Sequence, residues 1–295
     1  MDLTPNDEQI ALQTATADWC RDNMRLDGAR SRAPTLWPQL DAMGWVGMTA
    51  PGMGLDHATE ALVFAELGRF LAPVALLSGA VAARWAPGGG KIALALPADH
   101  AVRVLDSDGA TLALGLFGDA LRRFAIDGTA SPTPSLDQSA TIARIAVPDA
   151  VEAIGDPRAA LHLQLLAAAF GVGCADAARD MAAEYAKMRE QFERPIGWFQ
   201  AIKHMCADMA VRSAVARSQL YYAACALDAG GGDAAFHVAA AKRLADQAAL
   251  DNGRANIQIH GGIGMTDEAY PHFCLKRAHL LQFIAPADGA ALLAA

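Results

Sequence analysis

Two short stretches of this chain combine side chains and bare backbone suited to a flat, doubly phosphorylated ligand. The first reads Arg-Glu-Gln-Phe-Glu-Arg-Pro-Ile-Gly-Trp-Phe-Gln and covers residues 189–200. An arginine guanidinium can grip a pyrophosphate through two parallel hydrogen bonds. Glutamine amides can donate to phosphate or adenine, and phenylalanine rings can pack on a flat ring. The residues able to make such contacts are Arg189, Gln191, Phe192, Phe199 and Gln200.

The second stretch, Gln258 to Gly264, reads Gln-Ile-His-Gly-Gly-Ile-Gly. Gly261 and Gly262 allow positive φ and close backbone approach, so their amides suit a negatively charged or carbonyl-rich ligand. A structural interpretation exists for each stretch alone. Paired glycines often end a helix, and an arginine near a helix C-terminus stabilises the helix dipole. The two stretches lie one helical hairpin apart, and their combination favours ligand binding.

Long helices are needed to position both stretches. Apolar residues in the second of these helices recur at steps of three and four from Ile202 to Leu227, which lays one stripe along a helix. Gly230 to Gly232 end it, and Asp233 is a suitable N-cap for the next helix. Short connections between long helices predict an antiparallel four-helix bundle. Its expected segments are 156–190, 197–229, 233–260 and 267–285.

The rest of the chain divides into a helical part and a short β part. A helix start at Thr4 to Asp7 opens the helical part, which includes an expected extended segment from Trp45 to Thr49. Pro87-Gly-Gly-Gly breaks the helical pattern, and short strand-like runs follow. We therefore expect an N-terminal helical domain over 1–88, a shortened β domain over 89–150 and the bundle over 151–295. The expected strands cover 92–96, 101–105, 110–114 and 141–147.

Composition narrows the class of protein. The net charge of −8 argues against nucleic acid or an anionic membrane as a partner. Five cysteines without a Cys-x-x-Cys pair indicate buried thiols in a reducing compartment. The acidic start is not a signal peptide, and the apolar run from Leu161 to Phe170 is too short to span a bilayer. No metal-site spacing is apparent among the eight histidines. These features predict a cytoplasmic protein without membrane spans.

The order of helices, small β domain and four-helix bundle resembles the acyl-CoA dehydrogenase family. Leu40-Asp-Ala-Met-Gly-Trp-Val-Gly-Met and Phe64-Ala-Glu-Leu-Gly-Arg-Phe-Leu-Ala-Pro are similar to its first domain. The resemblance implies a mainly α fold with FAD as cofactor. It also implies that both stretches reach the FAD of a neighbouring subunit. Glu193 departs from the family pattern, which usually has glycine there. The matching positions are Arg189, Gln191, Phe192, Ile196, Phe199, Gln200, Gln258, Gly261 and Gly262.

The family's catalytic base is a glutamate at one of two places, and neither place has one here. The C-terminal tail from Leu280 to Gly289 contains no glutamate. The second place, about 26 residues before Arg189, is Leu163, and the nearest carboxylate is Asp156. We therefore expect no catalytic residue in this chain, with Glu268 as a weak candidate. Asp288 is a weaker candidate, and His260 and His272 are expected either to be structural or to support the groups that contact the ligand.

Some bacterial acyl-CoA dehydrogenases are heterotetramers in which one of two related subunits carries the base. The missing bases and the short β segment resemble the reduced subunit of such an α2β2 assembly. This resemblance implies a larger homologous partner, an acyl-CoA substrate and an electron-transfer flavoprotein as electron acceptor. Two alternatives stay open: a self-sufficient homo-oligomer using Glu268, and a helical scaffold that does not touch flavin.

Overall fold

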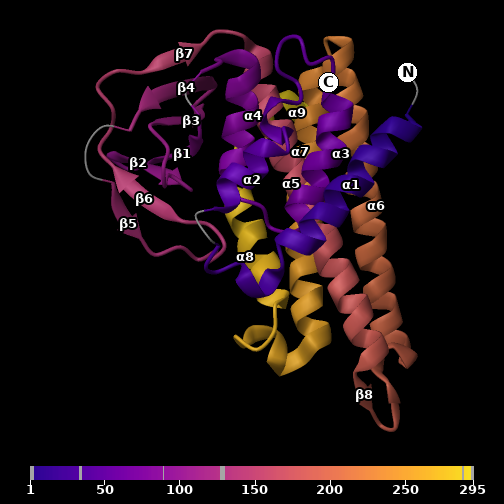
Figure 1. The fold of residues 1–295 in the computed structure, drawn as a ribbon. Coiled ribbons are helices and arrows are strands. Elements are labelled where there is room, and N and C mark those ends of the chain that lie inside the picture. The colour runs from indigo at the N-terminus through magenta and orange to yellow at the C-terminus, as the bar shows by residue number, and fades with distance from the viewer. Residues whose placement is uncertain (1–2, 33–34, 89, 127–129, 288, 294–295) are drawn as a thin grey trace.

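Helices form one side of the molecule and a mixed β-sheet forms the other (Figure 1). The structure is a computed structural model that describes residues 3–32, 35–88, 90–126, 130–287 and 289–293. The mainly α fold class with a small β domain is thereby confirmed. The division into three domains stays a prediction.

Within its described residues, the N-terminal part contains four helices. They are α1 (Asp7–Asn23), α2 (Leu36–Ala42), α3 (His57–Arg69) and α4 (Ala75–Trp85), with short 3₁₀ turns η1 (Leu26–Gly28) and η2 (Trp45–Gly47). Helix α1 begins at Asn6, whose side chain accepts from the Gln9 backbone while the Gln9 side chain accepts from Asn6 N–H. The prediction of an extended segment from Trp45 to Thr49 is wrong, since Trp45–Gly47 form a 3₁₀ turn. The chain turns tightly there because Trp45 is buried edge-on against the Trp19 ring, 5.1 Å between centroids.

A seven-stranded sheet has the order β5-β6-β2-β1-β3-β4-β7, with one parallel pair, β1 and β3. One face packs on the helices through residues such as Leu94, Leu105 and Leu114. The other face has a small core of its own, around Val104 and Phe124. The strands are β1 (Ile92–Ala98), β2 (Ala101–Leu105), β3 (Leu112–Phe117), β4 (Ala120–Ala125), β5 (Ser131–Thr133), β6 (Ile142–Ile145) and β7 (Glu152–Ile154).

Three of these strands, β4, β5 and β7, were not expected from the sequence. Strand β4 contains two consecutive arginines, which obscure its alternation of buried Leu121 and Phe124. The neighbouring strand β7 provides a partner for one of these arginines. Arg123 lies opposite Glu152 of β7 and donates to its carboxylate at 2.7 Å. The sheet therefore continues past residue 150.

The bundle consists of α5 (Pro157–Met188), α6 (Gln200–Ala229), α7 (Ala234–His260) and α8 (Pro271–Leu281), followed by the short α9 (Gly289–Leu293). Helix α5 is long and apolar enough to cross a membrane, but 89% of its most apolar window is buried inside the fold. Its burial is that of a core helix of this fold. A Cβ at Gly173 would lie 1.9 Å from the Ala65 carbonyl oxygen, so this glycine lets α5 cross α3 closely.

One buried arginine ties the three parts of the chain together. The Arg277 guanidinium, on α8, donates to the Asp137 carboxylate and to Ser139 Oγ, both on the segment before β6. It also donates to the Ala72 carbonyl oxygen at 2.7 Å, between α3 and α4. Arg277 and Asp137 are each 1% exposed. This contact fixes the bundle relative to the sheet and so shapes the space between them.

Candidate functional site

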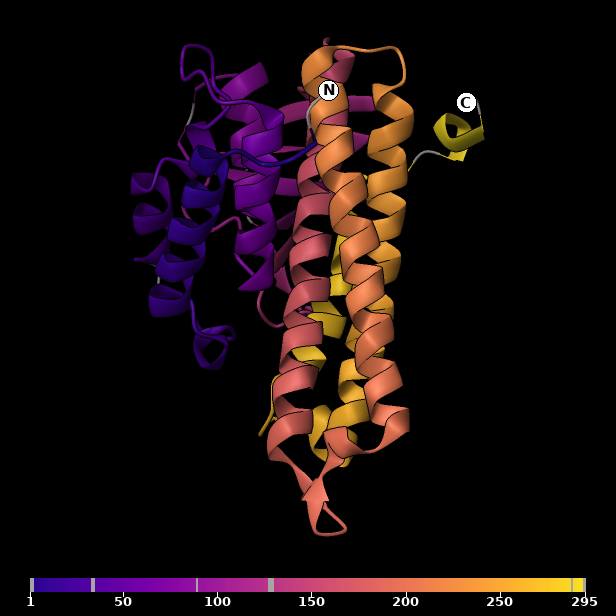
Figure 2. The ribbon, with the colours of Figure 1, turned by 90° about the vertical axis from the view of Figure 1, so that its right-hand side faces the viewer.

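The first predicted stretch folds into a small projection beyond the end of α5 (Figure 2). Strands β8 (Glu190–Gln191) and β9 (Arg194–Pro195) pair as a hairpin, and the 3₁₀ turn η3 (Ile196–Trp198) leads into α6. The two loop residues, Phe192 and Glu193, have φ of 54° and 63°. A two-residue loop with both φ values positive is the type I′ turn, which joins strands of the usual twist.

The projection offers its side chains to the outside. Phe192 is 83% exposed, although its ring lies edge-on to Phe199 at 5.9 Å. Within the part of the chain that the structure describes, the side chains of Arg189 and Gln200 make no hydrogen bond or ion pair. Gln191 Nε2 donates only to the Glu190 carbonyl oxygen. These groups are therefore available to a molecule outside this chain. Ile196 packs at the base against the core.

The second predicted stretch lies at the same end of the bundle. Helix α7 ends at His260, and the 3₁₀ turn η4 (Gly261–Met265) follows. Gly261 has φ 66° and ψ −146°, a conformation close to glycine-only. The rings of His260 and Tyr185 stack with centroids 4.0 Å apart, which joins the last turns of α7 and α5. Gln258, Gly261 and Gly262 are exposed, so both stretches present unengaged polar groups from one end of the molecule.

A cavity of about 1030 Å³ lies between the helix-facing side of the sheet, the start of α5 and the chain from α8 to α9. Its walls are mainly apolar and include Leu96, Leu116, Leu161, Leu280 and Phe283. Three basic side chains also line it, and within the described residues none of them has a hydrogen bond or ion pair: Arg103, Lys276 and His279.

Two acidic residues of the described chain line this cavity, Asp119 and Asp137. The Asp137 carboxylate is taken up by Arg277, and Asp119 is exposed. Leu163 is 1% exposed and packs in the core. The side chain that contacts the C-terminal segment is that of the next residue, Gln164. Its amide donates to the carbonyl oxygens of Ala285 and Pro286 at 3.2 and 2.7 Å.

The other acids weighed from the sequence lie away from the cavity. Asp156 caps α5, and its hydrogen bond from Arg158 lowers the pKa of its carboxyl group. Glu268 is exposed in the turn before α8 and does not line the cavity. Asp288 lies outside the described residues. His272 is buried beside Arg30 and likewise lines no part of the cavity.

The hairpin and the cavity lie at opposite ends of α5. Leu161 lines the cavity near the start of the helix, and Arg189 caps its far end. At 1.5 Å per residue, the intervening helix is about 42 Å long. A ligand touched by the hairpin is therefore not a ligand seated in the same chain's cavity.

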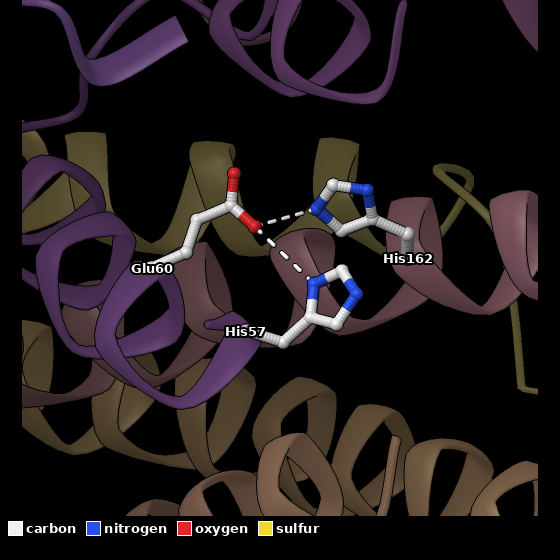
Figure 3. Close-up of side chains that lie close together, drawn as sticks. All are labelled: His57, Glu60 and His162. Atoms are coloured by element: carbon white, nitrogen blue, oxygen red, sulfur yellow. Dashed lines mark hydrogen bonds and ion pairs between the residues drawn. The ribbon is translucent and has the colours of Figure 1, made fainter. Parts of the chain in front are cut away.

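A buried cluster that the sequence did not reveal joins α3 to α5 (Figure 3). His162 Nε2 lies 2.6 Å from Glu60 Oε2, and His57 Nδ1 lies 3.5 Å from the same oxygen. Trp85 Nε1–H can only donate, so it donates to His162 Nδ1 at 3.1 Å. His162 therefore carries its proton on Nε2 and donates it to Glu60. The only sequence signal was the spacing of His57 and Glu60 on one helix face.

The electrostatics of this cluster favour a neutral histidine beside an ionised carboxylate. Burial lowers the pKa of His162 despite the adjacent Glu60. Burial alone would raise the pKa of Glu60, but the two histidines bring it down to about 2. The three side chains could be read as metal ligands. However, two ligands of a tetrahedral zinc ion lie about 3.3 Å apart. The 2.6 Å separation is that of a hydrogen bond.

Comparison with known proteins places this geometry in a family. Residues 6–86 match the family model of the acyl-CoA dehydrogenase N-terminal domain, and residues 159–285 match that of the C-terminal domain. The chain is 32% identical over 265 residues to acyl-CoA dehydrogenase IpdE2 of Mycobacterium tuberculosis, covering 83% of this chain and 80% of that protein.

Two solved structures share the fold over nearly the whole chain. A variant of the Tcur3481-Tcur3483 steroid ACAD superposes with a TM-score of 0.80 at 22% identity, covering 98% of this chain and 96% of the other. The ChsE4-ChsE5 complex of Mycobacterium tuberculosis gives 0.74 at 21% identity, covering 96% and 94%. With the two family models and the similarity to IpdE2, these comparisons confirm the predicted resemblance: the chain belongs to the acyl-CoA dehydrogenase family.

Proposed function

We propose that this chain is one subunit of an FAD-dependent acyl-CoA dehydrogenase and lends contacts to a flavin seated mainly on a larger homologous subunit. That partner carries the catalytic glutamate, and the assembly oxidises an acyl-CoA thioester to its trans-2-enoyl form. The bound FAD would supply the acceptor for the hydride that leaves the β-carbon. An α2β2 assembly with an electron-transfer flavoprotein as acceptor follows from the family resemblance.

The separation of hairpin and cavity along α5 is the observation that carries this proposal. Arg189, Gln191 and Gln200 have no strong partner of their own, and Arg189 lies about 42 Å along α5 from Leu161, which lines this chain's cavity. Exposed Phe192 and Trp198 beside them are apolar surface that a second chain would cover. We assign Arg189 to the flavin phosphates, Gln191 and Gln200 to phosphate or adenine, and Phe192, Ile196 and Phe199 to packing. Gln258, Gly261 and Gly262 line the same site with side-chain amide and backbone N–H groups.

The cavity supports a partner-held base. Removal of the α-proton needs an unengaged carboxylate in a dry site. Within the described residues, Asp137 is neutralised by Arg277 and Asp119 is exposed. Glu268, the substitute considered from sequence, does not line the cavity. The wide, mainly apolar cavity and the steroid enzyme among the structural relatives favour a bulky, ring-bearing acyl-CoA as substrate of the assembly.

Co-expression with the adjacent reading frame tests the proposal. The chain alone should purify colourless and without activity toward acyl-CoA, whereas the complex should be yellow and active. Arg189→Gln should remove most of the bound flavin from the complex. Arg243→Gln is the matched control, since Arg243 is exposed on α7 without an ion pair in the described structure. Full flavin occupancy in the Arg189 variant would instead support a scaffold role, and turnover by the lone chain would support a self-sufficient enzyme.

A further inference from the structure

We propose that Glu193 recognises the ribose hydroxyls in the adenylate half of the dinucleotide and makes the hairpin selective for a ligand that carries them. This inference rests on the proposed function, because it requires the hairpin to reach a flavin dinucleotide on the partner. It adds a specificity-determining residue at the position where the family usually has glycine.

The geometry of the turn makes glutamate an unfavourable choice for folding alone. Glu193 has φ 63° and follows Phe192 at φ 54°. Type I′ turns strongly prefer Asn-Gly or Gly-Gly, because side chains other than Asn, Asp and Gly are strained there. Strain of this kind persists at sites where the side chain contributes something else. The carboxylate at the hairpin tip is therefore a candidate for ligand contact.

The Glu193 carboxylate also has no bonding partner among the described residues of this chain. Glu193 makes no hydrogen bond or ion pair within the described residues, although two arginines lie nearby in sequence. The Arg194 guanidinium lies 5.5 Å from the centre of the Trp198 ring, and the Lys203 ammonium lies 5.6 Å from the same ring centre. Glu193 is exposed at the tip, so its oxygens are free to accept hydrogen bonds from outside.

The charge and hydrogen-bonding capacity of a carboxylate limit which part of the ligand Glu193 can contact. An ionised carboxylate only accepts hydrogen bonds, so it repels phosphate and binds hydroxyl groups. Acidic side chains bind the ribose 2′-hydroxyl in dinucleotide sites of other folds. Arg189 lies at the base of the hairpin and Glu193 at its tip, about 10 Å apart along the strand. One ligand can therefore place its phosphates at Arg189 and its ribose at Glu193 without a clash of charge.

Two flavins that differ by one hydroxyl test this assignment. FAD and an analogue lacking the 2′-hydroxyl of its adenosine ribose are titrated into the flavin-free complex, and binding is followed by flavin fluorescence. The native complex should bind FAD about tenfold more tightly, as expected for one hydrogen bond to a charged group. Glu193→Gln should reduce this preference to less than threefold, and Glu193→Gly should abolish it while raising the unfolding midpoint.

The outcomes separate this inference from the proposed function. Arg189→Gln should weaken both flavins by the same factor, since it acts on the phosphates. If Arg189→Gln weakens both flavins but Glu193→Gln keeps the full preference for FAD, the ribose assignment is wrong and the flavin-contact role stands. If Glu193→Gln instead weakens subunit assembly in the absence of flavin, Glu193 pairs with a cation of the partner and the inference is overturned. Failure of Arg189→Gln to weaken either flavin would contradict the proposed function itself.

Discussion

The Tyr185 and His260 rings stack nearly parallel, with centroids 4.0 Å apart and an interplanar angle of 22°. Tyr185 is in the last turn of α5, and His260 is the last residue of α7. His260 Nδ1 donates to the Asn256 carbonyl oxygen at 2.8 Å, and burial lowers the pKa of the imidazole. A neutral, oriented ring thus links the two segments that the proposed function assigns to one flavin.

Tyr185→Ala should separate these two segments. Aromatic pairs contribute about 0.5–1.5 kcal/mol beyond the area they bury. We expect the variant to lose about 1–2 kcal/mol of unfolding free energy and to weaken flavin binding by the complex. Tyr185→Phe, which keeps the ring, should behave like the native chain. Denaturant unfolding and flavin titration measure the two effects, and equal flavin affinity in Tyr185→Ala would show that the stack does not position the site.

Gly197 should tolerate no side chain. A Cβ built there lies 2.9 Å from the Ala186 carbonyl oxygen, so Gly197→Ala would push η3 away from α5. We expect a loss of about 1–3 kcal/mol in unfolding free energy, with weaker flavin binding because the hairpin base moves. Gly232→Ala is the matched control, since nothing lies within 4 Å of its Cβ position. Equal unfolding midpoints for the two variants would refute the close approach.

Arg277→Met should be among the most damaging single changes. It leaves the buried Asp137 carboxylate without its partner and the Ala72 carbonyl oxygen without a donor. Breaking a buried ion pair from one side costs about 3–5 kcal/mol. The double variant Arg277→Met with Asp137→Leu should recover part of this stability, because no charge is then stranded. Thermal unfolding of native, single and double variants tests this; a double variant less stable than the single one would contradict it.

Acid should weaken the fold through the buried cluster. The pKa of His162 is below its ordinary 6.5 in the native state, so this imidazole is protonated more readily in the unfolded chain. The free energy of unfolding therefore decreases as the pH drops below about 6.5. The ionised Glu60 adds stability that is complete above its ordinary value of 4.5 and is lost as pH falls toward about 2. Unfolding free energies between pH 7.5 and 3.5 should therefore decrease steadily.

A variant tests whether this cluster is the source. Glu60→Gln should be less stable than the native chain at pH 7.5, because two histidines lose their carboxylate. The gap between the two proteins should narrow as pH falls below about 4.5. A constant gap across the range would place the acid sensitivity elsewhere.

The helical architecture was predictable because the spacing of apolar residues and the residues that begin and end helices indicate the same segments. The stripe from Ile202 to Leu227 is the buried or half-buried face of α6, and Gly230 ends that helix with φ 65°. Asp233 is at the N-cap position of α7 as expected, but its side chain caps no backbone N–H and lies 3.4 Å from His237 instead. The local sequence therefore predicted where α7 begins, but the contact of the Asp233 carboxylate depends on the neighbouring His237 side chain.

The features missed from the sequence depend on contacts between distant residues. Strand β4 is stabilised by the register pairing of Arg123 with Glu152, which no local pattern contains. The pairing of Glu60 with His162 joins α3 to α5 and depends on how closely these helices cross. Likewise, the positive φ of Glu193 emerges only when the strands on either side of it pair as a hairpin.

Flavin content is the most direct measure of the central claim that this chain completes a flavin site on another polypeptide. The chain alone, the complex with its base-bearing partner and the complex carrying Arg189→Gln should be compared for bound FAD per flavin site. We expect no FAD on the chain alone, full occupancy in the native complex and a loss of most FAD in the variant. Stoichiometric FAD on the isolated chain, unaffected by Arg189→Gln, would contradict the claim.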